Sequence, residues 1–305
     1  MSLPVLDAPP AAAVPIATRR VFDLAALLTL LAVALGSVVC ATESGFECGN
    51  WPGCTASALL PSGPVTSFFY KNPWIEMTHR TSAILAGPLA LAAGILALRL
   101  RHVHPLVKVL PWVTVAGALV AGYVGRLTVL GLPVPSWVGA FDLGSALTAM
   151  VAMVVAAVAL RRGTTGGTAS RASILAWTGL VLMVAMHLVS LFAAGKGSYT
   201  RCLSWPVWGL VPADHSVGTA VQVVRVVLAV LAGAAVVATV ALVRARDRRW
   251  AVAVGVLLGL VLVFGVVIRL TQSDQLGVPF SLATVGLVWT QAQVAARLSF
   301  RRHSS

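Results

Sequence analysis

The chain has 305 residues, of which 58% are hydrophobic and 10% are charged, and its formal net charge is +13. Soluble domains average about 45–50% apolar and about 25% charged residues, so this composition excludes a soluble protein of any fold. A strongly positive charge can indicate nucleic-acid binding, but here the basic residues lie in short clusters between apolar runs. We therefore predict an integral membrane protein in a lipid bilayer, with no nucleic-acid partner.

Several apolar segments are long enough to cross a bilayer as helices, because a span needs about 20 residues. In chain order they cover about 21–41, 74–100, 106–130, 136–160, 172–194, 215–243, 250–271 and 277–299. The sequence lacks the alternation typical of strands, so the predicted fold is all-α with eight transmembrane helices. The N-terminal stretch from Met1 to Ala17 is rich in proline and alanine and lacks the basic region that opens a signal peptide, which favours a retained first helix over a cleaved signal.

Arginine and lysine are distributed unequally between the two sides that eight spans define. The side of the membrane with more basic residues holds Arg19, Arg20, Arg99, Arg101, Lys108, Arg161, Arg162, Arg171, Arg244, Arg246, Arg248, Arg249, Arg297, Arg301 and Arg302. The opposite side holds Lys71, Lys196 and Arg201. Because cytoplasmic loops carry the excess of positive charge, we predict a multi-pass protein of the cell membrane with both termini in the cytoplasm.

The chain repeats itself in a way that predicts two related halves. Both outer loops contain Cys-x-x-Trp-Pro, at 48–52 and 202–206, and Arg-Leu-Thr closes the third and seventh segments, at 126–128 and 269–271. Four helices per half give both halves the same membrane orientation, so we expect a parallel internal repeat of two tandem four-helix bundles. The predicted units are a cytoplasmic tail at 1–20, a first half at 21–162, a linker at 163–170, a second half at 171–300 and a tail at 301–305.

The four cysteines fall on or near the predicted outer side. Cys48 and Cys54 lie in the first outer loop, Cys40 ends the first segment, and Cys202 lies in the second outer loop. An outer location permits disulfides. Four cysteines allow three pairings, among which the sequence does not choose. We prefer Cys48–Cys54 because the two are close in sequence, and free thiols are the alternative.

Charged residues inside predicted spans mark a candidate site, because a charge in hydrocarbon is costly. Four arginines fall there as repeat-related pairs, Arg80 with Arg225 and Arg126 with Arg269. Such groups normally face the bundle interior and meet a partner. The guanidinium group of arginine can donate two parallel hydrogen bonds to a propionate or another anionic head group, so these four side chains are candidate ligand-binding groups.

One stretch of the second segment gathers further chemistry. Its spacing places Glu76, His79 and Arg80 on one helix face, and Asp142 lies at a comparable depth in the fourth segment. The functional interpretation is a site for an anionic ligand, with His79 as a metal ligand or proton carrier and Glu76 as an acid or base. The alternative is an internal salt-bridge cluster in which Glu76 pairs with Arg80 and Asp142 pairs with Arg126.

Three motifs resemble those of a known family. The stretch Gly36–Cys54 is similar to G-x-x-V-R-x-T-x-S-G-x-x-C-x-x-W-P-x-C, the first outer segment of heme A synthases, with Cys40 in place of the arginine. The stretch 74–80 is similar to their E-x-x-H-R helix, and 125–133 resembles the end of their third helix. The resemblance implies an eight-helix membrane oxidoreductase that oxidises a methyl group of heme O to the formyl group of heme A.

The family ligates heme with four histidines, a pair in each half, and also has a glutamate implicated in the chemistry. Residue by residue, His79 matches the first histidine and Glu76 the glutamate. The other histidine slots hold Asp142, Val224 and Gly286. Heme is therefore the expected cofactor at His79, while the C-terminal heme b site is expected to be lost, because valine and glycine cannot ligate iron.

The family's outer-loop cysteines form disulfides, and Cys48 and Cys54 match its first pair. The favoured function is heme A synthase-type oxidation of a heme methyl group, with Glu76 and His79 as catalytic residues and His79 as the metal ligand. The cofactor-binding residues would be His79, Arg80, Arg126, Asp142, Arg225 and Arg269. The alternative is a non-catalytic protein that binds heme or an anionic lipid, or a structural paralogue that serves as partner to another membrane protein.

Overall fold

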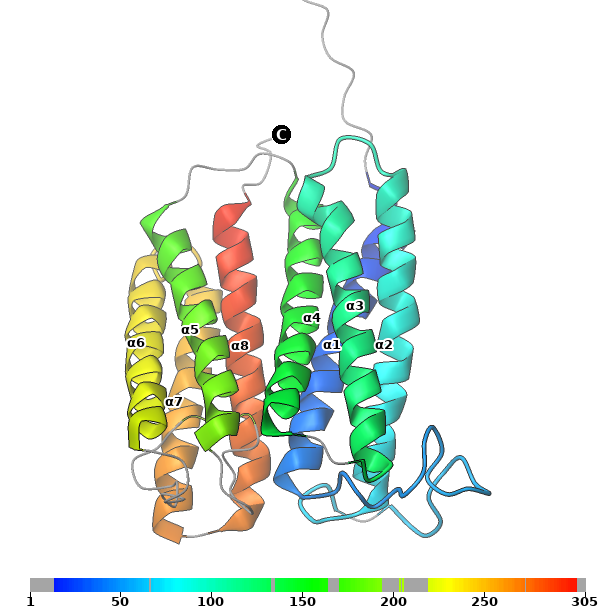
Figure 1. Ribbon diagram of the computed structural model, residues 1–305. Coiled ribbons are helices and arrows are strands. Elements are labelled where there is room, and N and C mark those ends of the chain that lie inside the picture. The colour runs from blue at the N-terminus through cyan, green and yellow to red at the C-terminus, as the bar shows by residue number, and fades with distance from the viewer. Residues whose placement is uncertain are drawn as a thin grey trace, which may run out of the picture.

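A computed structural model describes residues 14–65, 67–132, 135–163, 170–193, 203, 205, 219–271 and 273–300. In this part of the chain the regular structure is helical, and no strand occurs (Figure 1). The elements are α1 (Ile16–Ala41), α2 (Pro73–Arg99), α3 (Pro105–Val129), α4 (Ser136–Arg162), α5 (Arg171–Ala193), α6 (Thr219–Val243), α7 (Arg248–Thr271), the short 3-10 helix η2 (Asp274–Leu276) and α8 (Gly277–Ser299).

Seven of the described helices, α1 to α7, are long and apolar enough to cross a membrane. This confirms the prediction of an all-helical, multi-pass membrane protein. Helix α8 has a comparable length but is not among these seven, and its polar side chains, including Thr284 and Gln291, are buried. Because these side chains contact protein rather than lipid, a central helix can tolerate them. The membrane span expected at 277–299 stays a prediction.

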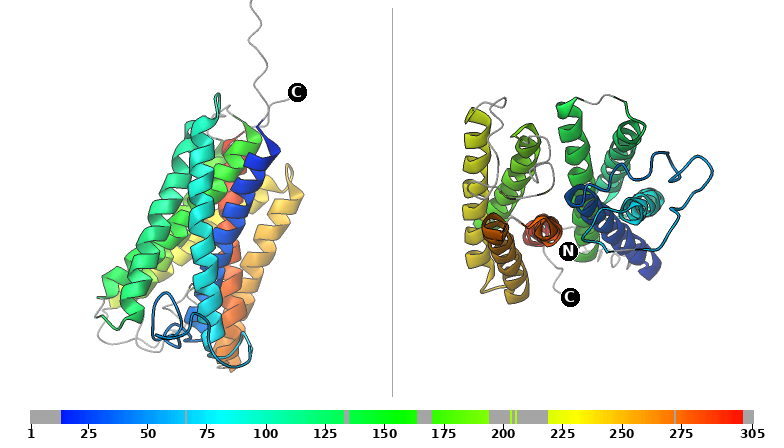
Figure 2. Two further views of the ribbon diagram at one scale, coloured as in Figure 1. Left: turned by 90° about the vertical axis from the view of Figure 1, so that its right-hand side faces the viewer. Right: turned by 90° about the horizontal axis from the view of Figure 1, so that it is seen from below.

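Helix contacts fall into two rings. In the first ring α1 contacts α2, α2 contacts α3, α3 contacts α4, and α4 contacts α1. In the second ring α5 contacts α6, α6 contacts α7, α7 contacts α8, and α8 contacts α5. Helix α8 also contacts α1 and α4, so it lies between the two groups, as the view from below shows (Figure 2).

Small and polar residues mediate close helix contacts. A Cβ atom at Gly117 in α3 would lie 2.7 Å from the carbonyl oxygen of Ser145 in α4, so no larger residue fits between these backbones. Between the two groups, Arg162 Nη1 donates to the carbonyl oxygen of Arg297 at 2.8 Å. The two rings are therefore joined by hydrogen bonds as well as by packing around α8.

Several sequence predictions lie outside the described residues. These are the tails at 1–13 and 301–305, the linker at 164–169, and most of the second outer loop with Lys196, Arg201 and Cys202.

Helix α1 begins at Ile16, where 21 was predicted, and α2 to α5, α7 and α8 lie within a few residues of their predicted bounds. Hydropathy locates such helices well because the bilayer sets both their length and their composition.

Candidate functional site

The start of α2 is fixed by a polar cap, and this cap places the candidate site. Asn72 Oδ1 accepts hydrogen bonds from the backbone nitrogens of Trp74, at 3.1 Å, and Ile75, at 3.3 Å. Pro73 occupies the first helical position, where its missing N–H costs nothing. The backbone nitrogen of Asn72 donates to Ser44 Oγ at 3.2 Å, which ties the start of α2 to the chain that leaves α1.

The first outer loop is closed by a disulfide between Cys48 and Cys54. The predicted pair is therefore confirmed. Both cysteines are buried and pack with Met77 of α2. Cys40, at the end of α1, is disulfide-bonded as well. The loop consequently lies against the first two turns of α2.

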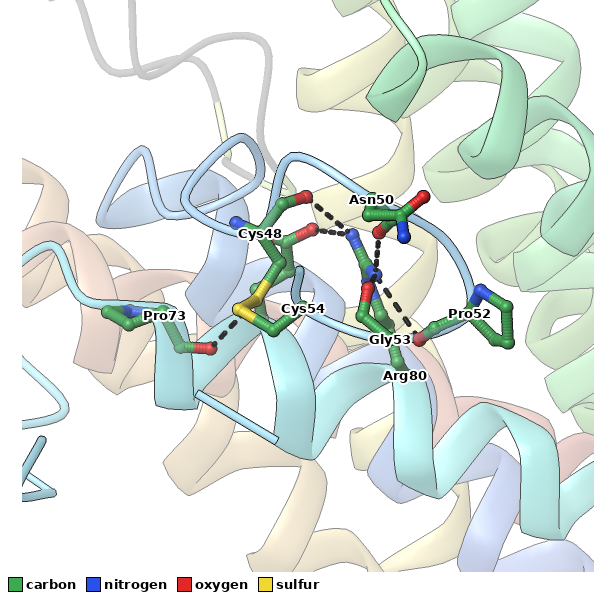
Figure 3. A network of polar contacts seen from close by, with 8 residues as sticks. Cys48, Asn50, Pro52, Gly53, Cys54, Pro73 and Arg80 are labelled. Carbon is green, nitrogen blue, oxygen red and sulfur yellow. Dashed lines mark hydrogen bonds and ion pairs between the residues drawn. A yellow bond between two sulfur atoms is a disulfide. The ribbon is translucent and has the colours of Figure 1, made fainter. Parts of the chain in front are cut away.

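Arg80 holds this loop through its main-chain carbonyl groups (Figure 3). Its Nη1 atom donates to the carbonyl oxygens of Asn50, at 2.6 Å, and Gly53, at 3.0 Å, with a longer contact of 3.4 Å to Pro52. Its Nη2 atom donates to the carbonyl oxygen of Cys48 at 3.0 Å. Both terminal nitrogens of this predicted ligand-binding arginine are thus engaged within the protein.

Glu76 completes the same network. Its Oε1 atom forms an ion pair with Arg80 Nη2. Its Oε2 atom accepts a hydrogen bond from the backbone nitrogen of Cys48 at 2.9 Å. The residue is 2% exposed and Arg80 is 7% exposed. The Glu76–Arg80 pair of the salt-bridge alternative is therefore present, and proton transfer by Glu76 would first require this buried pair to open.

His79 points toward α1 instead. Its Nδ1 atom lies 2.9 Å from the carbonyl oxygen of Ala32. A carbonyl oxygen only accepts, so Nδ1 carries the proton and Nε2 keeps its lone pair. Gly36, one turn further along α1, makes room for the ring, since a Cβ there would lie 2.9 Å from His79 Cε1. The imidazole is therefore held in the tautomer that a metal ligand needs.

Asp142 and Arg126 do not form an ion pair of the kind that joins Glu76 to Arg80. Among the described residues no ion pair joins Asp142 to Arg126, so that part of the salt-bridge alternative is absent. Asp142 is half-buried in α4. Arg126 is exposed and lies over the ring of Trp51, with its Cζ atom 5.5 Å from the ring centroid. Because Trp51 belongs to the loop that Arg80 holds, Arg126 contacts the same loop from α3.

In the predicted second half, the two positions that the resemblance matches to family histidines are Val224 and Gly286. Val224 is 48% exposed on the surface of α6. A Cβ at Gly286 in α8 would lie 3.2 Å from Leu257 Cδ2, so this slot is filled by α7. Arg269 lies exposed near the end of α7, whereas Arg225 is 1% exposed in α6. The repeat-related arginines therefore differ in their surroundings between the two halves.

Sequence reasoning missed two groups that position His79, the carbonyl oxygen of Ala32 and the space at Gly36. The described residues also contain no cluster of three or more His, Cys, Asp or Glu side chains that could hold a metal ion by themselves. Heme iron does not need such a cluster, because the porphyrin supplies the equatorial ligands and one histidine suffices as a proximal ligand.

Together these features define a multi-pass helical membrane protein with a disulfide-closed loop between α1 and α2 and, on α2 beside it, a histidine whose Nδ1 is bound to α1. No protein-family model matches the chain. The chain is 32% identical to the heme A synthase of Methylobacterium sp. (strain 4-46) over 167 residues, which are 52% of this chain and 45% of that protein. It is also 32% identical to the heme A synthase of Methylobacterium nodulans over 146 residues, which are 45% of this chain and 39% of that protein. The chain thus covers less than half the length of these curated relatives, and its sequence is heme A synthase-like.

Proposed function

We propose that this protein is a heme A synthase-type membrane oxidoreductase that binds heme in its first half with His79 as an axial ligand. The observation that carries the proposal is the contact between His79 Nδ1 and the carbonyl oxygen of Ala32, because it leaves Nε2 as the free ligand atom. A metal-binding histidine typically donates its other ring N–H to a carbonyl or carboxylate group in this way, which fixes the orientation of the ring. The two curated relatives, each named heme A synthase, support the same chemistry.

His79 in the first half is a residue that can bind heme iron. The two positions of the second half that the resemblance matches to histidines hold residues that cannot. His79 is the one nitrogen donor at these slots, since the other three hold Asp142, Val224 and Gly286. Val224 and Gly286 have no atom that could bind iron. The substrate of the proposed reaction is a heme methyl group, and the chain's own contribution is to orient His79 and to exclude water beneath the outer loop.

In this proposal Glu76 and Arg80 act mainly by positioning. Their buried pair fastens the loop to α2 at two positions that flank His79 in the sequence. Arg126 and Arg269, which are exposed at the same ends of α3 and α7, are the candidate partners for the propionates of a heme. Glu76 serves as an acid or base only in a state in which its pair with Arg80 is open.

The topology belongs to the same proposal. Two parallel four-helix halves, at 21–162 and 171–300, would place the outer loops on one side of the membrane and both termini in the cytoplasm. The two rings of helix contacts support this division, and disulfides are consistent with an extracytoplasmic loop. The partners are then the lipid bilayer, heme and any membrane protein that delivers it.

The experiment is an absorption spectrum of the purified full-length protein, oxidised and dithionite-reduced, from cells supplied with heme. We expect a Soret band and a heme content near one per chain. Cells that make heme O should accumulate heme A only when the protein is present. Bound heme without heme A would support the non-catalytic alternative, and folded protein without heme would contradict the proposal.

Replacing Gly36 with alanine tests how His79 is positioned. The added methyl group would press on the imidazole, displace Nδ1 from the carbonyl oxygen of Ala32, and lower heme affinity by about 10-fold, the lower range for loss of a second-shell partner. Heme titration of the purified variant measures this. Gly87→Ala is the matched control, because nothing lies within 4 Å of a Cβ at that position. Equal heme affinity in both variants would contradict the role of Gly36.

A further inference from the structure

The second half contains a buried pair of side chains whose polar atoms have no partners. Arg225 in α6 and His187 in α5 are each 1% exposed. Within the part of the chain that the structure describes, the two terminal nitrogens of Arg225 and both ring nitrogens of His187 have no hydrogen-bond partner. The two helices that carry them pack against each other. Buried polar groups are nearly always satisfied, so this cluster requires a missing group.

Ser190 fixes the direction of the guanidinium. Its hydroxyl donates to the carbonyl oxygen of Met186 at 2.7 Å and accepts a hydrogen bond from Arg225 Nε at 2.7 Å. Ser190 follows His187 by three residues, so both lie on the same face of α5. The Nε contact leaves Nη1 and Nη2, the two outer nitrogens of the guanidinium, to bind a further group.

The contrast with Arg80 shows what is missing. Arg80 occupies the related position in α2 and engages Glu76 and several carbonyl groups of its loop. Arg225 is buried as deeply, and among the described residues its one hydrogen-bond partner is the neutral hydroxyl of Ser190. A buried guanidinium without a counter-charge is strongly unfavourable, and a carboxylate is the group that matches its paired donors best.

We propose that Arg225, Ser190 and His187 form a binding site for the carboxylate of an amphipathic ligand, either a fatty acid or a porphyrin propionate. The carboxylate accepts from Nη1 and Nη2 of Arg225, and His187 adds one N–H donor. This site goes beyond the proposed function, which uses His79, and it is separate from the slot at Val224, which faces outward.

The test uses full-length protein that has been purified in detergent and stripped of lipid. Binding of palmitate, hexadecanol and metal-free protoporphyrin is measured for the wild type and for Arg225→Gln. We expect Arg225→Gln to weaken binding of a carboxylate ligand at least about 10-fold, because a charge-assisted bidentate contact is lost. Hexadecanol, which lacks a carboxylate, should bind both proteins equally.

Comparing palmitate with protoporphyrin identifies which kind of molecule supplies the carboxylate. Arg225-dependent binding of palmitate alone assigns a fatty acid, and Arg225-dependent binding of protoporphyrin alone assigns a propionate. Thr239→Val is the matched control on α6, since the Thr239 hydroxyl bonds only within its own helix, to the carbonyl oxygen of Ala235. Failure of the wild type to bind either carboxylate, or equal binding by Arg225→Gln, would overturn the proposal.

A protein-derived counter-charge would also overturn it. Asp214, in the second outer loop, is the acid of this chain to test, and it lies outside the described residues. A double-mutant cycle between Asp214→Asn and Arg225→Gln, followed by thermal unfolding of the lipid-free protein, should show no coupling. Strong coupling would mean that the guanidinium already has a partner. Because Arg225→Gln removes an unpaired buried charge, the variant should fold at least as stably as the lipid-free wild type.

Discussion

Replacing His79 with alanine is expected to remove heme from the protein while leaving the helices intact. Loss of a second-shell partner typically costs about 10- to 100-fold in metal affinity, and loss of the ligand itself should cost more. The side chain forms one hydrogen bond to α1 and is half-buried, so the fold does not depend on it. The Soret band and the iron content of the purified variant measure the effect.

Two further variants make the His79 result specific. In His79→Gly, added imidazole should restore part of the Soret band, because the space beside Gly36 can hold the free base. His104→Asn is the control, since His104 caps α3 through its Nδ1 atom and asparagine keeps that cap. Full heme content in His79→Ala would refute ligation by this residue and, with it, the site proposed for the first half.

Replacing Arg80 with alanine should have the largest effect on stability. The change leaves Glu76 as a buried, unpaired carboxylate, and breaking a buried pair from one side typically costs about 3–5 kcal/mol. It also frees the carbonyl groups of Cys48, Asn50 and Gly53 from their common donor. We expect a lower midpoint of thermal unfolding in detergent and faster proteolysis of the loop at 42–72.

The chain provides an internal comparison for this effect. Lys71 and Glu47 form an ion pair at 3.0 Å in the same region, but their side chains are 54% and 32% exposed. Lys71→Ala should therefore cost no more than about 1 kcal/mol. In a cycle with Glu76→Gln, the double variant should be less destabilised than the sum of the single changes. Equal, small effects of Arg80→Ala and Lys71→Ala would show that the buried network does not hold the loop.

Local spacing in the sequence predicted the features that depend on neighbouring residues. The helices follow from apolar runs of membrane length, the Glu76–Arg80 pair from a spacing of four residues on one helix, and the Cys48–Cys54 bond from proximity. Each requires knowledge of one segment of the chain at a time.

Contacts between distant segments could not be predicted in the same way. The carbonyl oxygen that binds His79 belongs to Ala32, and a backbone acceptor leaves no mark in the sequence. The Asp142–Arg126 pair of the salt-bridge alternative is absent from the described residues, because equal depth in neighbouring helices does not fix the direction of two side chains. His187 gave no signal as a lone histidine, and its significance depends on how α5 packs against α6.

The burial of α8 has a consequence for how the protein is assembled in the membrane. A segment with buried Thr284, Gln291 and Gln293 gains less from lipid than the helices before it. Its favourable environment exists only once α1, α4, α5 and α7 have come together around its path. We therefore expect the insertion of α8 into the membrane to be coupled to the docking of these four helices. A chain that ends before Gly277 would leave two helical groups in the bilayer without the element that both of them contact.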